Sequence, residues 1–251
     1  MFINIKKYIT SRLNKLEIII NTPGAYKARK SGCYLEFYAV VYNIFRRSIK
    51  PETIIDIGAN RGMFVKCANC IFPEATIYAF EPLKEPYHEL CKLKKKIPKL
   101  ECYNIAIGEK SEEITIYKNN YDYSSSLLEM NDLHKNAFPY TAELTMEKVE
   151  VKTLDNVLSG KNLEKPILMK IDVQGYEKFV LNGSQETLKH VNYVICELSF
   201  FELYKGQALF NDVYNMFIEY GFNFFGQLGE LRHPETDQTL QIDAFFIKNN
   251  L

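Results

Sequence analysis

From residue 53 onward, short apolar runs alternate with amphipathic segments of about ten to fifteen residues. Several of the apolar runs are rich in isoleucine and are followed by a polar or acidic residue. This alternation is typical of repeated βα units, whose strands form a parallel sheet with helices on its faces. The pattern predicts strands at Ile54 to Ile57, Ala75 to Phe80, Leu100 to Ile107, Ile167 to Ile171 and Tyr193 to Cys196.

The amphipathic segments predict helices at Arg61 to Ile71, Leu83 to Ile97, Thr153 to Leu158, Tyr176 to His190 and Asn211 to Tyr220. Thr153 suits an N-cap, and Gly221 suits a C-cap. Two further apolar runs, Asn223 to Gln227 and Ile242 to Lys248, flank the polar segment Glu230 to Thr239. They predict a closing antiparallel hairpin on an otherwise parallel sheet.

The βα rhythm is interrupted in the middle of the chain. Strands are predicted at Glu113 to Lys118 and at Glu147 to Lys152, with the weakly periodic segment Asn119 to Phe138 between them. A loop of this length inside a compact domain is uncommon and tends to be functional. We therefore predict a lid or a substrate-binding segment here.

The N-terminal 50 residues follow a different, helical pattern. Apolar residues at mostly helical spacing predict a first helix over Met1 to Ile20, then a turn at Asn21 to Gly24, and a second helix from about Gly32 to Ile49. Lysines and an arginine on the first helix allow contact with a membrane surface or a partner, although a packed amphipathic helix is the commoner meaning. We predict a helical extension over 1–50 and one domain over 51–251.

Composition narrows the class of protein. Lysine plus arginine equals aspartate plus glutamate at 31 each, so no overall charge favours nucleic acid. No apolar run reaches the roughly 18 residues that a membrane span needs. Cys67 and Cys70 allow a metal or redox interpretation, but no second Cys-x-x-Cys completes a zinc site, and two small residues on one helix face are the simpler explanation. We expect a cytoplasmic protein with reduced thiols and no metal.

The predicted strand ends carry the candidate chemistry. In open α/β sheets the ligand binds outside the carboxyl ends of the strands. The polar residues there are Asp56, Glu81, Asn104, Asp172 and Glu197. Acids would repel a pyrophosphate, but they suit a ligand with ribose hydroxyls, an amino group and a sulfonium charge.

The loop after the first strand discriminates between cofactors. A dinucleotide fingerprint has the pattern Gly-x-Gly-x-x-Gly, whereas this chain has Gly58 and Gly62 with Asn60 in place of the second glycine. This difference favours S-adenosylmethionine over NAD. An NAD-dependent oxidoreductase, or a plain strand-to-helix turn without a ligand, stays open as an alternative.

Ordered motifs over most of Pro51 to Lys248 strengthen the cofactor prediction. They are Asp56-Ile-Gly-Ala-Asn-Arg-Gly-Met-Phe64, Phe80-Glu-Pro82, Asn104-Ile-Ala-Ile-Gly108, Ser125-Ser-Leu127, Val151-Lys-Thr-Leu-Asp155, Lys170-Ile-Asp-Val-Gln-Gly-Tyr-Glu177 with Gly183, Cys196-Glu-Leu198 and Gly221-Phe222. In this set the chain resembles the FkbM family of S-adenosylmethionine-dependent methyltransferases. The resemblance implies the class I methyltransferase fold, an α/β Rossmann-like three-layer sandwich with a seven-stranded, mostly parallel sheet.

The resemblance also implies roles for individual residues. The cofactor contacts that it implies are Asp56, Gly58, Asn60, Gly62, Phe64, Glu81, Asn104, Ile105, Ala106 and Asp172. The glycine loop would shape the methionine end of the pocket, Glu81 would hold the ribose, and Asn104 to Ala106 would flank the adenine. Members of this family are associated with O-methylation of sugars and of secondary-metabolite hydroxyls.

Methyl transfer to a hydroxyl needs alignment, exclusion of water and a base within hydrogen-bond reach. Asp172 is the first candidate for this base, with Glu197, His134 and Glu177 in reserve; structural roles are the alternative for each. We therefore predict an O-methyltransferase of a carbohydrate or similar hydroxylated metabolite. A cofactor-binding scaffold that acts through the N-terminal helices is the competing hypothesis.

Overall fold

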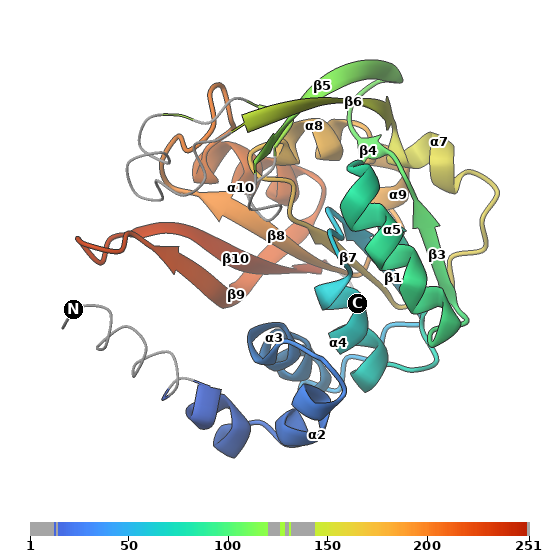
Figure 1. Cartoon of the computed structure of the whole chain (residues 1–251). Helices are drawn as coiled ribbons and strands as arrows, with labels where there is room; N and C mark the ends of the chain where they lie inside the picture. The colour runs from blue at the N-terminus through green and yellow to red at the C-terminus, as the bar shows by residue number, and fades with distance from the viewer. Residues whose placement is uncertain (1–12, 14, 120–125, 129–130, 132–143, 250–251) are drawn as a thin grey trace.

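The computed structural model describes residues 13, 15–119, 126–128, 131 and 144–249. Its centre is a seven-stranded sheet (Figure 1). The strand order is β3 (Leu100–Tyr103), β2 (Thr76–Phe80), β1 (Thr53–Ile57), β7 (Ile167–Ile171), β8 (Tyr193–Ser199), β10 (Thr239–Lys248) and β9 (Phe222–Arg232). The first five strands run parallel, and β10 is antiparallel to both of its neighbours. The predicted mixed sheet with a closing hairpin is confirmed.

Helices cover both faces of this sheet, which gives three layers. On one face lie α2 (Ala25–Lys30), α3 (Leu35–Phe45), α4 (Met63–Ile71) and α5 (Lys84–Lys92), with the short 3-10 helix η1 (Leu93–Lys95) after α5. On the other face lie α7 (Leu154–Leu158), α8 (Glu177–Asn182), α9 (Gln185–Leu188) and α10 (Phe210–Glu219).

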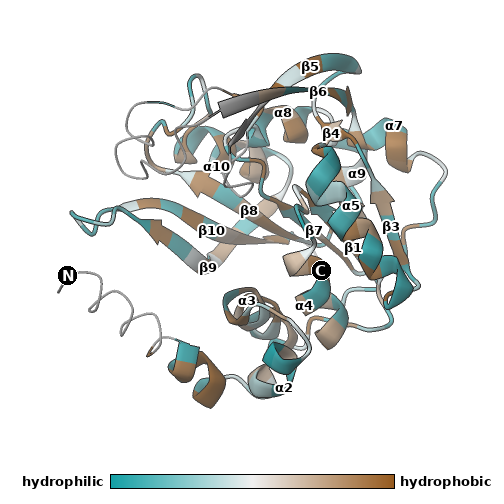
Figure 2. Cartoon of the chain, in the orientation of Figure 1, coloured by the Kyte–Doolittle hydropathy of each residue, from teal (hydrophilic) through white to brown (hydrophobic). Residues whose placement is uncertain are grey.

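Strand β1 shows why the sheet is buried on both faces. Every residue of β1 is buried, as expected for a parallel strand that reads as a continuous apolar run. Its side chains alternate, so Ile55 and Ile57 join the core beneath α7–α10, while Ile54 joins the core beneath α2–α5. By contrast, β9, which forms one edge of the sheet, is largely exposed. Apolar and polar residues form alternating bands along β9 and β10 (Figure 2).

The N-terminal helices pack on the sheet. Buried side chains of α2 and α3, among them Ala28 and Val41, belong to the same hydrophobic cluster as Ile54, Leu168 and Phe245 of the sheet. Helix α2 lies between the predicted turn and the predicted second helix and was not expected. The predicted boundary near residue 50 stays a prediction. Within the described residues, no helix has the length and apolar character required to cross a membrane.

A second, three-stranded sheet accounts for part of the interrupted region. Strand β6 (Leu144–Lys152) lies between β4 (Ala106–Ile107) and β5 (Glu112–Asn119). Both predicted strands of this region, at Glu113 to Lys118 and Glu147 to Lys152, are confirmed with longer bounds. Of the predicted lid, most of Asn119 to Phe138 falls outside the described residues.

One predicted strand and one predicted helix are each divided into two shorter elements in the structure. The strand Leu100 to Ile107 ends at Tyr103, because the chain leaves the main sheet there and β4 pairs with β6 instead. The helix Tyr176 to His190 is interrupted at Gly183, where the backbone lies so close to another segment that a Cβ atom would come within 1.9 Å of the Gly108 carbonyl oxygen. A separate helix, α9, then begins with its backbone N–H groups donating to Asp155.

Strand β8 and the closing hairpin are longer than predicted. Because β8 continues to Ser199, Glu197 lies within the strand rather than directly after its end. Strands β9 and β10 extend into the polar segment, so that only 233–238 connect them. Polar residues fit these strands because one face of the hairpin is exposed.

The predicted Thr153 cap is confirmed, since its Oγ1 accepts a hydrogen bond from the Asn156 N–H.

Candidate functional site

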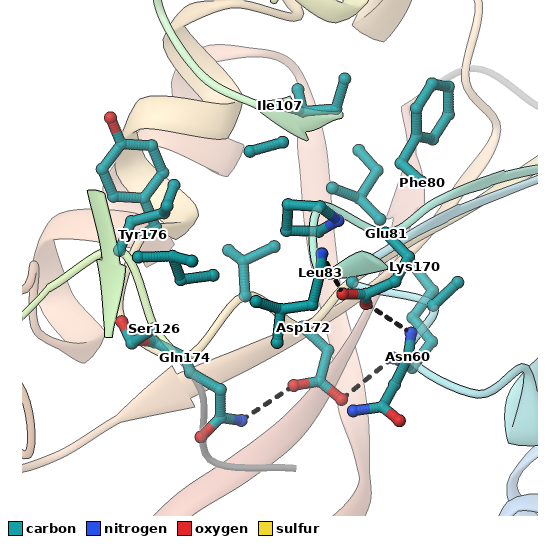
Figure 3. A pocket seen from close by; sticks show the side chains of 18 of the residues that line it. Asn60, Phe80, Glu81, Leu83, Ile107, Ser126, Lys170, Asp172, Gln174 and Tyr176 are labelled. Carbon is teal, nitrogen blue, oxygen red and sulfur yellow. Dashed lines mark hydrogen bonds and ion pairs between the residues drawn. The ribbon is translucent and has the colours of Figure 1, made fainter. Parts of the chain in front are cut away.

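A pocket opens at the carboxyl edge of the main sheet, beyond the ends of β1, β2 and β7 (Figure 3). Its empty volume, including the open mouth, is about 810 Å³. Of the predicted cofactor contacts, the structure brings to the lining Gly58, Asn60, Phe64, Glu81, Ile105, Ala106 and Asp172. Asp56, Gly62 and Asn104 do not line it.

The Glu81 carboxylate sits at the tip of β2 and is held by backbone donors. Its Oε2 accepts from the Asn60 N–H at 2.8 Å, and its Oε1 accepts from the Leu83 N–H at 2.9 Å (Figure 3). The residue is only 5% exposed. These two hydrogen bonds fix the orientation of the carboxylate, which lines the pocket.

The glycine loop after β1 is shaped by close backbone contact. Gly58 has a φ of +84°, and a Cβ atom there would lie 1.9 Å from the Asp172 carbonyl oxygen. The N–H groups of Gly58 and Ala59 both donate to the Phe80 carbonyl, which joins the loop to β2. Gly62, at φ +75°, lies against Leu90 and Leu93 and serves helix packing. Only the first of the two glycines therefore shapes the pocket wall.

Asn104 acts on the pocket through the backbone. Its Nδ2 donates to the carbonyl oxygens of Glu81 and Pro82 at 2.9 and 2.8 Å, which holds the segment that carries Glu81. The next two residues, Ile105 and Ala106, line the pocket. Together with Phe80 they make one end of the pocket apolar, as a flat aromatic base requires.

Asp56 is fully buried one residue before the end of β1. Its carboxylate has no hydrogen-bond partner within normal range, and its Oδ1 lies 3.8 Å from the Lys170 Nζ. Burial raises the pKa of Asp56 to about 6, although the Lys170 charge opposes this rise. Asp56 is therefore placed to act through Lys170, which itself lines the pocket.

Lys170 connects the two acids of this region, and sequence reasoning assigned no role to it. Its Nζ donates to Asp172 Oδ2 at 3.0 Å while lying near Asp56. Burial lowers the pKa of Lys170, but the charges of Asp172 and Asp56 outweigh burial and raise it overall. The ammonium group therefore stays protonated. The available signal was a lysine in the middle of an otherwise apolar strand.

Asp172 lies directly after β7 with a partly exposed carboxylate. Burial alone would raise its pKa, but Lys170 and the hydrogen bond from Gln174 prevail, and the pKa lies below its usual value. Its Oδ1 accepts from the Gln174 Nε2 at 3.0 Å (Figure 3). Asp172 is therefore an ionised, fixed hydrogen-bond acceptor that faces the pocket.

Gln174 is a second pocket residue that sequence reasoning missed as an individual. It has a positive φ of 56°, and its Nε2 bridges Asp172 and Glu197, with 2.9 Å to Glu197 Oε2. The Gln174 Oε1 accepts from the Tyr204 hydroxyl, and the Gln174 carbonyl accepts from the Ser126 hydroxyl. These contacts join Asp172 to segments far away in the sequence.

The reserve base candidates are placed differently from Asp172. Glu197 lies behind Gln174 and does not line the pocket; burial, followed by the neighbouring Asp172 and Glu177, raises its pKa well above the usual value. His134 lies outside the described residues. Ser126 and Leu127 line the pocket, whereas Ser124 and Ser125 are also outside the described residues.

Glu177 has a structural role, because its buried side chain holds the turn that follows Asp172. It is 3% exposed, and its Oε1 accepts from the N–H groups of Val173 and Gly175, which closes the turn after Asp172. Burial raises its pKa to about 7, against the opposing effect of its backbone hydrogen bonds. Glu177 therefore supports the loop that presents Asp172 and Gln174 to the pocket.

This raised pKa predicts a pH-dependent stability. Because folded Glu177 binds its proton more tightly than the unfolded chain, its contribution to stability is greatest below the unfolded pKa and decreases as pH rises towards the folded value of about 7. The difference between the folded and the unfolded pKa of Glu177 corresponds to about 3 kcal/mol of stability. We expect Glu177→Gln to remove this loss of stability at higher pH, because glutamine does not titrate. Its side-chain carbonyl oxygen can still accept the two backbone hydrogen bonds. Urea unfolding of both proteins at several pH values checks it; equal pH dependence would contradict it.

Within the described residues, no group of three or more histidine, cysteine or acidic side chains is placed to hold a metal ion. The pocket instead combines an apolar end, a carboxylate at the tip of β2 and an ionised carboxylate beside a lysine. With the seven-stranded sheet, this arrangement defines a class I methyltransferase fold. The chain belongs to the Methyltransferase FkbM domain family, whose profile matches residues 56–224.

Individual relatives agree with the family. The 2-O-methyltransferase NoeI of Sinorhizobium fredii is 28% identical over 166 residues, covering 63% of this chain and 68% of that protein. The hexuronic acid methyltransferase AglP of Haloferax volcanii is 24% identical over 163 residues, covering 63% of this chain and 61% of that protein. Among solved structures, Aeropyrum pernix fibrillarin with S-adenosyl-L-methionine has a TM-score of 0.47 and 7% identity, covering 84% and 76% of the two chains. That low likeness says nothing of activity.

Proposed function

We propose that this protein transfers a methyl group from S-adenosylmethionine to a hydroxyl oxygen of a sugar or a similar hydroxylated metabolite. The observation that carries the proposal is the presence of two fixed carboxylates, Glu81 and Asp172, in one pocket with an apolar end. The family and the two named relatives support methyl transfer, and the relatives' names support an oxygen or a sugar acid as acceptor.

The residues present fit S-adenosylmethionine. The Glu81 carboxylate, held by two backbone N–H groups, can accept hydrogen bonds from both hydroxyls of a ribose. Phe80, Ile105 and Ala106 provide apolar surface for an adenine. Asp172 and the glycine loop at Gly58 would then border the methionine portion. The carboxylates at this edge of the sheet suit a cationic sulfonium better than a pyrophosphate.

When bound, S-adenosylmethionine supplies an electrophilic methyl group on a positively charged sulfur. Asp172 is placed to orient the acceptor hydroxyl by accepting its hydrogen bond, and to take the proton as the new bond forms. The proton of the hydroxyl becomes strongly acidic as the new bond to its oxygen forms. A carboxylate with a low pKa can therefore accept this proton late in the reaction. Lys170 and Gln174 keep Asp172 ionised and fixed.

The carboxylate at the tip of β2 provides a direct test of the pocket. We expect Glu81→Ala to weaken binding of S-adenosylhomocysteine by more than about tenfold, because charged hydrogen bonds contribute about 1.5 to 3 kcal/mol. Isothermal titration calorimetry measures this affinity. Glu85→Ala is the matched control, since its side chain is 61% exposed and pairs with Arg61 outside the pocket lining. Unchanged affinity in Glu81→Ala would contradict the assignment.

Turnover distinguishes this proposal from its competitors. Release of S-adenosylhomocysteine on incubation with S-adenosylmethionine and a panel of methyl glycosides supports an enzyme. Cofactor binding with no release on any hydroxylated acceptor supports a scaffold. Enhanced NADH fluorescence on mixing with the protein, without response to S-adenosylhomocysteine, would support an oxidoreductase.

A further inference from the structure

One aromatic side chain of the N-terminal helices reaches the pocket. Phe37 of α3 lines it and is partly buried, with its ring 6.5 Å from the Phe64 ring in an edge-to-face arrangement. The Lys170 Nζ lies 6.0 Å from the Phe37 ring centroid and 3.0 Å from Asp172 Oδ2. Phe37 therefore lies at the Asp172 end of the pocket, where methyl transfer is proposed.

A row of carboxylates leads away from this end of the pocket. Strands β7, β8 and β10 are neighbours, with Ile171 opposite Cys196 and Glu197 opposite Asp243. The alternation of side chains places Glu197 and Asp243 on the sheet face covered by α3, two residues from Ile195 and Phe245 of that core. Both acids are partly exposed but do not line the pocket itself, so they extend the polar surface beyond its Asp172 end.

The electrostatics of this row are acidic. Burial, together with the nearby Asp172, raises the pKa of Asp243 to about 6, so Asp243 is still mostly ionised near neutral pH. Burial, followed by the neighbouring Asp172 and Glu177, raises the pKa of Glu197 well above its usual value. Lys170 offsets one negative charge and is already paired with Asp172. The row therefore carries hydrogen-bond acceptors and a residual negative charge.

An aromatic ring beside hydrogen-bonding carboxyl groups matches the chemistry of a neutral sugar. A pyranose has an apolar C–H face that packs on an aromatic ring and hydroxyl groups that donate to carboxylates. An amino sugar adds a favourable positive charge. A sugar carboxylate would place like charges close together, which is unfavourable.

We propose that the acceptor is an uncharged or amino sugar, held between the Phe37 ring and the side chains of Asp172, Glu197 and Asp243. This inference rests on the proposed sugar O-methyltransferase function and deepens it. It places part of the acceptor site on α3, which lies outside the matched family domain at residues 56–224. The N-terminal segment is then a determinant of acceptor specificity, and a uronic acid is disfavoured.

The first experiment tests the aromatic wall. Initial rates are measured as S-adenosylhomocysteine release with methyl glucoside, methyl glucosaminide and methyl glucuronide. Phe37→Ala is expected to raise the KM for the best glycoside about tenfold, the loss expected for an aromatic contact, whereas Phe37→Tyr keeps it within about threefold. Tyr34→Ala is the matched control, because Tyr34 is 50% exposed at the start of α3 and does not line the pocket.

The second experiment tests the charge of the row. Wild-type protein is expected to have at least about tenfold higher kcat/KM for the glucoside or glucosaminide than for the glucuronide. The double variant Glu197→Gln, Asp243→Asn is expected to reduce this ratio, and Glu74→Gln, on the exposed surface, to leave it unchanged. Calorimetry with S-adenosylhomocysteine verifies that each variant keeps its fold and cofactor site.

The outcomes separate the two proposals. Methylation of a glycoside with an unchanged KM in Phe37→Ala, or a preference for the glucuronide, would overturn this inference and leave the proposed function intact. Absence of methylation of all three glycosides, with normal S-adenosylhomocysteine binding, would contradict the sugar function and this inference with it.

Discussion

Replacement of Asp172 by asparagine is expected to reduce methyl transfer about a hundredfold or more, the usual range for a lost general base. The amide keeps the shape of the side chain but loses the negative charge that takes the proton and that pairs with Lys170. Affinity for S-adenosylhomocysteine is expected to change little. Single-turnover rates and calorimetry measure the two quantities separately.

The control for this variant is Asp237→Asn. Asp237 lies in the exposed hairpin loop between β9 and β10, at a positive φ that asparagine also adopts well. Full turnover in Asp172→Asn, combined with loss of turnover in Glu197→Gln, would transfer the role of base to Glu197. Full turnover in both variants would remove a carboxylate base from the mechanism.

The low pKa of Asp172 adds a pH dependence to this test. Since its pKa lies below the ordinary value, the carboxylate is ionised throughout the range from about pH 5 to 8. The single-turnover rate should therefore not show loss of this base over that range. An essential group that titrates near neutrality would point to a different residue.

Gly58→Ala is expected to destabilise the protein by about 3 kcal/mol or more and to abolish cofactor binding. A Cβ atom at this position would meet the Asp172 carbonyl oxygen at 1.9 Å, and the φ of +84° is unfavourable for alanine. Relief of the clash would move the Asp172 backbone, which is hydrogen-bonded to Ile57 at the end of β1. Urea unfolding and calorimetry measure both effects.

Gly160→Ala separates steric clash from backbone strain. Gly160 has a similar φ of +73°, but a Cβ atom there would have no heavy atom within 4 Å. It should therefore cost only the strain of a left-handed alanine, about 1 to 2 kcal/mol, and leave cofactor affinity unchanged. Equal losses of stability in the two variants would show that strain, not contact with Asp172, governs Gly58.

Sequence patterns were sufficient for elements whose signals are local. The strand Ile167 to Ile171 and the cap at Thr153 match the structure, because a buried apolar run and a capping hydroxyl act within a few residues. Contacts between distant segments decided the others. The predicted helix from Tyr176 to His190 breaks where Gly183 meets Gly108, a contact that periodicity does not contain.

The candidate site shows the same division. Glu81 and Asp172 were identified because acids that follow parallel strands must meet at one edge of the sheet. Lys170 and Phe37 were missed because their places in the pocket depend on tertiary packing. Lysine in a buried strand becomes meaningful only when its partners are known.

The sequence by itself therefore determined the α/β class, the edge of the sheet that holds the pocket, and the family motifs. Only the tertiary structure decided which acids face the pocket. Asp56 and Asp172 both belong to strand-end motifs and lie on the same face of the sheet, but Asp56 is one residue inside its strand and fully buried, whereas Asp172 lies just beyond its strand and lines the pocket. Because Asp56 lies opposite Lys170 in the sheet, Asp172 lies two residues nearer the carboxyl edge, and only the register of the packed strands sets that difference in depth.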